Sequence, residues 1–317
     1  MPQPLMSIIN KTNNFFGLLL GLTGYTLVVL VDSIIKLNVV GKYPIIQINF
    51  FLCIGAFLPI IASIIILRNW SILINNKIHL QLLHGILGLT HGALIINSFK
   101  KHSLIEIYPI LFFSPLILTT LSHFFMKEKI GFRRWLAVLI GFVGVLIVSR
   151  PGTIHFTLPL LGLFIAAIIH ALRVLVIRHS SNQSSIHSSI AFSFYGCVSA
   201  FIISGFFSYQ NFVTVPKTDL IILIICGVIA GMAGLFFAIA SKTLESSLFA
   251  PIQYIQLVAG FIMGYIFFGD LPDIYETMGS FVIVLSGMFI IYRENQLKIR
   301  TLLDNKKRIK DTFSRWF

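Results

Sequence analysis

Two long stretches of the chain repeat one another, and this repeat constrains the fold more than any other feature. Residues 103–150 hold two apolar segments of about 20 residues each, the length needed to cross the ~30 Å core of a bilayer, joined by the charged hinge KEKIGFRR. Residues 245–293 repeat the pattern around the acidic hinge GDLPD. Pro109 matches Pro251 at an offset of 142 residues. The chain is therefore expected to consist of two related halves.

The composition indicates a membrane protein. Hydrophobic residues make up 56% of the 317 residues and charged residues only 11%, whereas a soluble domain carries about 25% charged residues. We therefore predict an all-α polytopic membrane protein with ten transmembrane helices, arranged as two inverted five-helix repeats. The predicted helices cover residues 15–37, 44–67, 79–98, 103–126, 132–149, 158–177, 186–208, 219–240, 246–268 and 274–292.

The distribution of basic residues predicts the orientation of these helices. The formal net charge is +13, but the basic residues lie in short loops and in the tail and do not form the contiguous face that nucleic acid requires. With a cytoplasmic N-terminus, 17 of the 24 Lys and Arg residues fall on the cytoplasmic side and five on the other. The positive-inside rule thus places both termini in the cytoplasm. Because each half has five helices, the two halves have opposite topologies.

The domain organisation follows from the repeat. We expect a cytoplasmic N-terminal segment at 1–14, a first repeat at 15–150, a second repeat at 158–293 and a basic cytoplasmic tail at 294–317. Inverted repeats can exchange outward-open and inward-open shapes, with the substrate site between them near the membrane midplane. The sequence therefore predicts a transporter whose partners are a small-molecule solute and the lipid bilayer, but no nucleic acid. It leaves open whether the protein is a monomer or a homodimer.

The motifs of the two halves resemble those of a known family. The runs PILFFSPLILTTL and APIQYIQLVAGFIMGYIFFGDLPD are similar to the two EamA domains of the drug/metabolite transporter superfamily, and APIQYIQL and FGDLPD look most like its bacterial branch that includes S-adenosylmethionine transporters. The resemblance implies a bacterial inner-membrane protein that moves S-adenosylmethionine, or a similar amphipathic or zwitterionic solute, by alternating access. Leu52 and His84 stand where that branch often carries arginine, which removes two bidentate anchors for carboxylate or phosphate.

Other functions remain as alternatives. One is an exporter of amino acids or toxic amphiphiles, and a more distant one is a membrane-embedded enzyme. An enzyme would need a converging set of catalytic side chains, and the charged residues here are dispersed, so we predict no enzymatic activity. We also expect no cofactor and no metal, because His84 and His91, seven residues apart, lack a third ligand. The three cysteines show no CxxC spacing.

Charged residues inside the apolar segments are the first candidates for the site. Asp32 and Lys36 are four residues apart and can pair on one helix face. Charges at membrane depth are costly, which favours a functional role, although Lys36 could also extend to the interface with Asp32 neutralising it. Arg173, which shares a helix face with His170, could likewise contact an anion in a cavity or extend to the cytoplasmic surface.

Neutral polar and aromatic side chains complete the predicted site. We expect His91, near the middle of its helix, to line the cavity and His84 to lie at the interface. The stretch from Gln253 to Gln256 offers amides beside an aromatic ring, opposite a more apolar wall at its 142-residue counterparts. The predicted substrate-binding residues are Asp32, Lys36, His91, Phe112, Ser114, His170, Arg173, Gln253, Tyr254 and Gln256.

Overall fold

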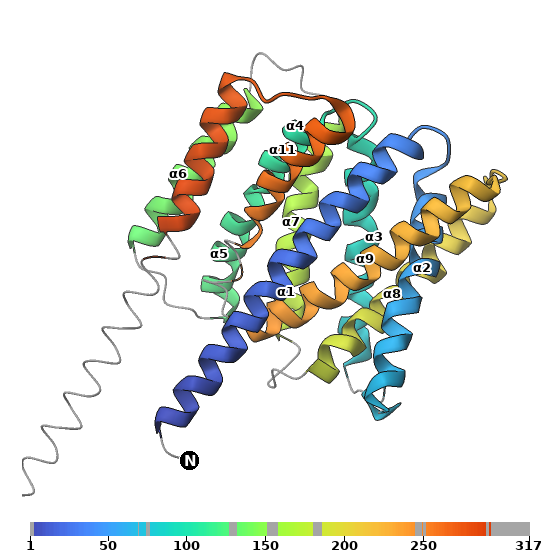
Figure 1. Ribbon diagram of the computed structural model, residues 1–317, viewed down its shortest axis with the longest axis horizontal. Helices are drawn as coiled ribbons and strands as arrows, with labels where there is room; N and C mark the ends of the chain where they lie inside the picture. The colour runs from blue at the N-terminus through green and yellow to red at the C-terminus, as the bar shows by residue number, and fades with distance from the viewer. Residues whose placement is uncertain are drawn as a thin grey trace, which may run out of the picture.

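The computed structural model describes residues 3–68, 70–73, 77–126, 132–150, 158–179, 186–244, 249, 252–289 and 292. All the regular secondary structure in these residues is helical (Figure 1). Residues 127–131 of the predicted hinge KEKIGFRR and the basic tail lie outside the described residues. The helices are α1 (Gln3–Asn38), α2 (Ile45–Leu67), the short 3₁₀ helix η1 (Trp70–Leu73), α3 (Ile78–Ser98), α4 (Leu104–Leu111), α5 (Phe113–Met126), α6 (Phe132–Ser149), α7 (Leu158–His179), α8 (Ile186–Tyr209), α9 (Lys217–Thr243), α11 (Ile255–Phe268) and a last apolar helix, Ile274–Phe289.

The ten apolar helices expected from the sequence are present. Six are long and apolar enough to span a bilayer and four are shorter, so the prediction of an all-α polytopic fold is confirmed. The fourth predicted helix is divided into α4 and α5. The first helix begins at Gln3, twelve residues before the predicted start at Phe15, because neither proline nor glycine interrupts the stretch between Leu5 and Phe16.

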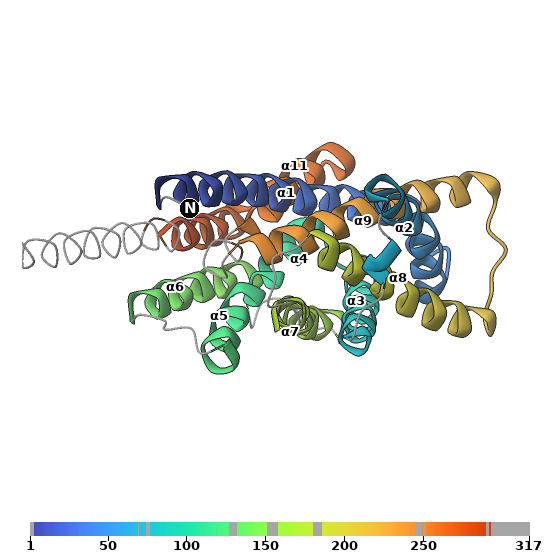
Figure 2. The ribbon, with the colours of Figure 1, turned by 90° about the horizontal axis from the view of Figure 1, so that it is seen from below.

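The helices of the two halves pack in equivalent ways. In the repeat, α1, α2 and α3 correspond to α7, α8 and α9. The contact between α1 and α9 therefore corresponds to the contact between α7 and α3. In the same way, the contact between α2 and α9 corresponds to the contact between α8 and α3. Figure 2 shows α1 and α11 along one face of the bundle and their counterparts α7 and α5 along the other, with α4 between them. This exchange of partners is what two inverted repeats produce.

Glycines bring the backbones of the crossing helices into contact. A Cβ atom on Gly85 of α3 would overlap the carbonyl oxygen of Gly196 on α8. In the other half, a Cβ atom on Gly227 of α9 would lie 2.8 Å from the Cα atom of Gly55 on α2. Gly85 and Gly227 are 142 residues apart, the offset of the sequence repeat. Small residues permit such close approach of helices within a bilayer, and both halves use them at the same place.

The divided helices of the two halves meet where each is interrupted. Pro115 has no N–H to give to the carbonyl of Leu111, so the helix breaks at Phe112 between α4 and α5. Residue 254, the 142-residue counterpart of Phe112, lies in a turn before α11. The free carbonyl of Leu111 accepts a long hydrogen bond of 3.5 Å from Nε2 of Gln253. Irregular backbone of this kind is tolerated at membrane depth only inside the protein.

Polar contacts join the two halves at the end of the bundle that holds the α1–α2 turn, which we call the turn end. Tyr43 donates a hydrogen bond of 2.8 Å to Asp219, which also pairs with Lys42 at 3.3 Å. Burial and the Asp219 carboxylate raise the pKa of the Tyr43 phenol, so it remains a donor. The amide of Gln47 makes two hydrogen bonds with the backbone of Val213. These contacts fix the α1–α2 turn and the start of α2 to the start of α9 and the segment before it.

The glycine crossing gives a direct test of the packing. Replacing Gly85 with alanine places a methyl group against the backbone of α8, and such overpacking costs about 1–3 kcal/mol. We expect Gly85→Ala to lower the thermal unfolding temperature of the purified protein in detergent. Gly234→Ala is the matched control, because nothing lies within 4 Å of the added Cβ atom. Equal unfolding temperatures for the two variants would contradict the described crossing.

Candidate functional site

A cavity of about 170 Å³ lies between the two halves, and we call it the central cavity. Its walls come from α1, α3, α4, α7 and α9 and from the interrupted segment before and within α11. The polar side chains that line it are Tyr25, Asp32, His91, Tyr108, His170, Arg173, Gln253 and Gln256. The position fits the predicted site at the junction of the inverted repeats.

Asp32 carries the negative charge of the central cavity. It lies on α1, and its carboxylate accepts a hydrogen bond of 2.9 Å from the hydroxyl of Tyr108 on α4. Tyr108 is 1% exposed, so its hydroxyl is fixed by packing. Among the residues that the structure describes, no cation lies within salt-bridge distance of Asp32. The carboxyl group is thus held in place by a hydroxyl donor, with no described cation beside it.

Arg173 carries the positive charge of the central cavity. Gly88 of α3 leaves room for the guanidinium, which lies 3.3 Å from where a Cβ atom on Gly88 would be. Nη2 of Arg173 donates to Nε2 of His84 at 3.4 Å, and the guanidinium also lies 5.8 Å from the ring centre of Phe237. Since arginine can only donate, Nε2 of His84 is an acceptor and the imidazole is neutral.

Two further histidines lie beside Arg173. Nδ1 of His91 lies 3.0 Å from the carbonyl of Ala166, which can only accept, so this nitrogen carries a proton. His170 is hydrogen bonded to Tyr25 across 3.2 Å, and its ring centre lies 5.3 Å from that of His91. These side chains contribute polar contacts from α1, α3 and α7 around the cavity.

The glutamines on the second half supply amide groups. Gln253 and Gln256 are both buried, at 4% and 5% exposure, and both line the central cavity. Gln253 bonds to the carbonyl of Leu111, its own repeat counterpart. For Gln256, no side-chain hydrogen bond is found within the described ranges. Its amide can therefore serve a bound solute as donor and acceptor.

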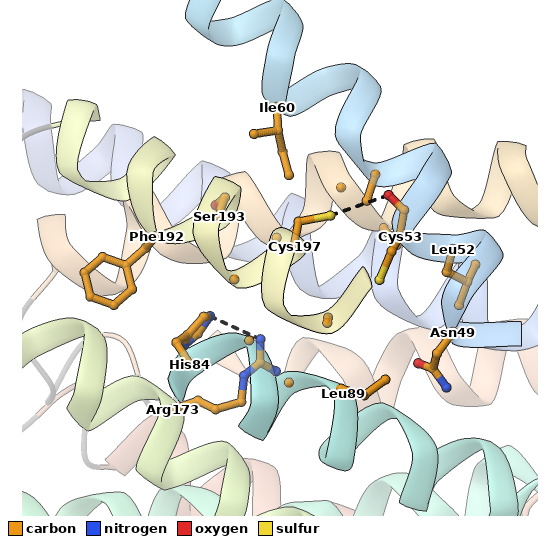
Figure 3. Close-up of a pocket in the computed structure, with 18 residues that line it drawn as sticks. Asn49, Leu52, Cys53, Ile60, His84, Leu89, Arg173, Phe192, Ser193 and Cys197 are labelled. Atoms are coloured by element: carbon orange, nitrogen blue, oxygen red, sulfur yellow. Dashed lines mark hydrogen bonds between the residues drawn. The ribbon is translucent and has the colours of Figure 1, made fainter. Parts of the chain in front are cut away.

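A second cavity of about 240 Å³ adjoins the first, and we call it the side cavity (Figure 3). It lies between α2, α3, α8 and α9. Its lining is mostly apolar and includes Leu52, Phe192 and the thiol-bearing residues Cys53 and Cys197. Three residues line both cavities: Arg173, Ala230 and Gly234. The guanidinium thus stands where the two cavities meet.

The structure brings six of the ten predicted site residues together in the central cavity and places four elsewhere. Lys36 does not pair with Asp32; its Nζ donates to the carbonyl of His102 at 2.7 Å. The rings of Phe112 and Tyr254 pack on each other with centres 5.3 Å apart, in a separate apolar cluster. Ser114 is buried and does not line either cavity.

Three residues of the site were missed or misplaced by sequence reasoning. Tyr25 is seven residues before Asp32, which puts both on one helix face, so the spacing could have indicated it. No sequence pattern singled out Tyr108, which precedes Pro109 in a run of mostly apolar residues. His84 was expected at the interface but is only 7% exposed and contacts Arg173. A buried arginine needs neighbours that can accept hydrogen bonds, and His84 supplies one.

Within the described residues, no group of three or more His, Cys, Asp and Glu side chains could hold a metal ion. Cys53 and Cys197 face each other across α2 and α8, and Sγ of Cys197 lies 3.5 Å from the carbonyl of Cys53. The two cavities together are lined by hydrogen-bonding groups, one acidic side chain (Asp32) and one basic side chain (Arg173). Such a set can bind a solute by non-covalent contacts.

Comparison with known proteins agrees with this architecture. A model of the EamA-like transporter family matches residues 15–150 and 157–293. The S-adenosylmethionine uptake transporter of Rickettsia prowazekii is 27% identical over 182 residues, which cover 57% of this chain and 61% of the relative. The riboflavin transporter of Vibrio cholerae is 27% identical over 183 residues, covering 58% and 61% respectively. The chain thus matches about three-fifths of the length of these relatives.

A solved crystal structure shares the fold. It superposes with a TM-score of 0.66 at 16% sequence identity and covers 90% of this chain and 99% of its own. At this identity the likeness concerns the fold alone.

The contact between Asp32 and Tyr108 can be tested by a double-mutant cycle. Tyr108→Phe keeps the ring but removes the donor, and a hydrogen bond to a charged group contributes about 1.5–3 kcal/mol. We expect Tyr108→Phe to destabilise the wild-type protein more than it destabilises the Asp32→Val variant, with a coupling energy of about 1 kcal/mol or more. Unfolding in denaturant measures all four proteins. Equal effects in both backgrounds would show that the two side chains do not interact.

Proposed function

Because the chain belongs to the EamA-like transporter family, we propose that it is a secondary transporter that moves a small metabolite through the central cavity by alternating access. The observation that carries the proposal is the cavity itself. It lies between the two inverted halves, where their helices are interrupted, and it is lined by polar groups from both halves. Membrane transporters commonly bind their solutes at such a junction.

The lining supports an amphipathic or zwitterionic solute. Asp32 and Arg173 offer opposite charges, Gln253 and Gln256 offer amides, and the adjoining side cavity offers apolar surface. S-adenosylmethionine combines a carboxylate, an ammonium, a sulfonium and a heterocycle, so it is our first candidate substrate, in line with the relatives that take it up. Riboflavin is the second candidate, because a relative of equal identity is named for it.

We further propose that the protein resides in a bacterial inner membrane with both termini in the cytoplasm. The unequal distribution of Lys and Arg residues supports this orientation. In it, the turn end faces away from the cytoplasm, and the contacts of Asp219 and Gln47 join the two halves on that side. The repeats at 15–150 and 158–293 would then both contribute helices to each side of the transport path, because their helices pack mainly on one another.

Reconstitution tests the proposal. The purified full-length chain is placed in liposomes with a labelled panel of S-adenosylmethionine, riboflavin, amino acids, nucleotides and cationic drugs. We expect saturable uptake of S-adenosylmethionine. Asp32→Asn and Gln253→Ala should each weaken the apparent affinity or initial rate by about fivefold or more, because a hydrogen bond to a charged or buried group contributes about 1–3 kcal/mol.

Lys217→Gln serves as the control variant, because Lys217 is exposed at the first residue of α9 and lines neither cavity. It should transport like the wild type. Uptake of no panel member above empty liposomes would refute the transport function, and full activity of both cavity variants would refute the assignment of the central cavity.

A further inference from the structure

We infer that Arg173 binds a carboxylate of the transported solute at the meeting point of the two cavities, while Asp32 binds a cationic group of the same solute. The inference rests on the proposed transport function and narrows its substrate class to molecules that carry both charges. It depends on the unsatisfied donors of Arg173, on the absence of a described acidic side chain beside it and on the position of Asp32 in the same cavity.

The guanidinium of Arg173 has more donors than partners. Arginine carries five N–H donors in a planar fork. Within the described part of the chain, Nη2 bonds to His84, and the buried Nε has no hydrogen-bond partner. No carboxylate of a described residue lies within 4 Å of the guanidinium. A charge removed from water without an opposite charge is costly, so an anion that enters the cavity would relieve that cost.

The neighbours of Arg173 do not supply the missing negative charge. His84 accepts from Arg173 and is neutral, and His91 uses the proton of Nδ1 for the carbonyl of Ala166. Phe237 contributes only the face of its ring. A carboxylate matches the arginine fork in shape and can take two parallel hydrogen bonds. The site therefore favours a planar monoanion over a neutral polar group.

Asp32 lines the same cavity as Arg173 and can carry the opposite charge. Its carboxylate is oriented by Tyr108, and Lys36, the nearest cation along its helix, is engaged by the carbonyl of His102. One acid and one base that line a single cavity without pairing with each other suit a solute with a carboxylate and a cationic group. The solute would satisfy both charges at once, which neither residue achieves alone.

The position of Arg173 also places the remainder of the solute. Because the guanidinium lines both cavities, a solute anchored there can extend into either one. The side cavity presents Leu52, Phe192 and the two cysteines, and it suits an apolar or aromatic portion (Figure 3). The central cavity, with Asp32, takes the cationic portion. The two cavities together thus select for a solute with three chemically distinct parts.

Matched solute pairs test the inference. Binding of S-adenosylmethionine and its decarboxylated analogue, and of methionine and methioninamide, is measured by calorimetry on the purified full-length protein, with riboflavin as a probe that has no carboxylate. We expect the carboxylate member of a pair to bind about 10- to 100-fold more tightly than its partner. In Arg173→Gln this difference should disappear. Arg173→Lys, which keeps the charge but loses the fork, should retain part of it.

Two further measurements separate recognition from a structural role. Arg173→Gln removes a poorly compensated buried charge, so its unfolding temperature without solute should equal or exceed that of the wild type. Arg178→Gln, on the same helix but lining neither cavity, should keep the wild-type preference for the carboxylate.

The outcomes distinguish this inference from the proposed function. Transport of riboflavin or of a cationic drug, neither of which carries a carboxylate, would keep the transporter and overturn the restriction to solutes that carry both charges. Equal binding of both members of every pair, or a marked loss of stability in Arg173→Gln, would also overturn it. Binding and transport of no probe would overturn both.

Discussion

The close crossing of α3 with α8, and of α9 with α2, is the contact on which the rest of the structure depends. At Gly85 and Gly227 the helices touch through their backbones, which no larger residue would permit. The two crossings are related by the sequence repeat, and both cavities lie beside them, with Ala230 and Gly234 of α9 lining each one. A bundle held by small residues at two equivalent points can keep its centre intact while its ends open or close.

Burying the side chains of Asp32 and Arg173 in the centre of the bundle costs free energy, and the need to pack the fold gives no reason for placing them there. Asp32 has a hydroxyl donor but no described cation, and Arg173 has a neutral histidine but no described acid. Two apolar residues would stabilise the fold at least as well. Unpaired charges that line a cavity are better understood as binding groups, and their cost is recovered when a solute of complementary charge is present. Asp32 and Arg173 thus lower the stability of the empty protein but provide binding groups for the solute.

The sequence predicted the helices better than it predicted the site. Hydropathy located ten apolar helices, because a membrane requires long apolar segments whatever their packing. The division at Phe112 was not predicted, since it depends on Pro115 and on a partner from the other half. Tyr254 was grouped with its neighbouring glutamines, but the interruption of the helix turns it toward Phe112. Contacts such as that of Arg173 with His84 join helices far apart in the sequence, and spacing along one helix cannot reveal them.

If the protein works by alternating access, the two ends of the bundle open in turn to the site between the inverted halves. Pulsed electron resonance distances between spin labels, on a variant without native cysteines in liposomes, test it most directly. One pair, at Lys100 and Lys217, reports on the turn end, and the other, at Trp70 and His187, reports on the opposite end. Alternating access predicts two distance populations for each pair, with a transported solute shifting the two ends in opposite directions. A single unchanged distance at both ends during active transport would contradict it.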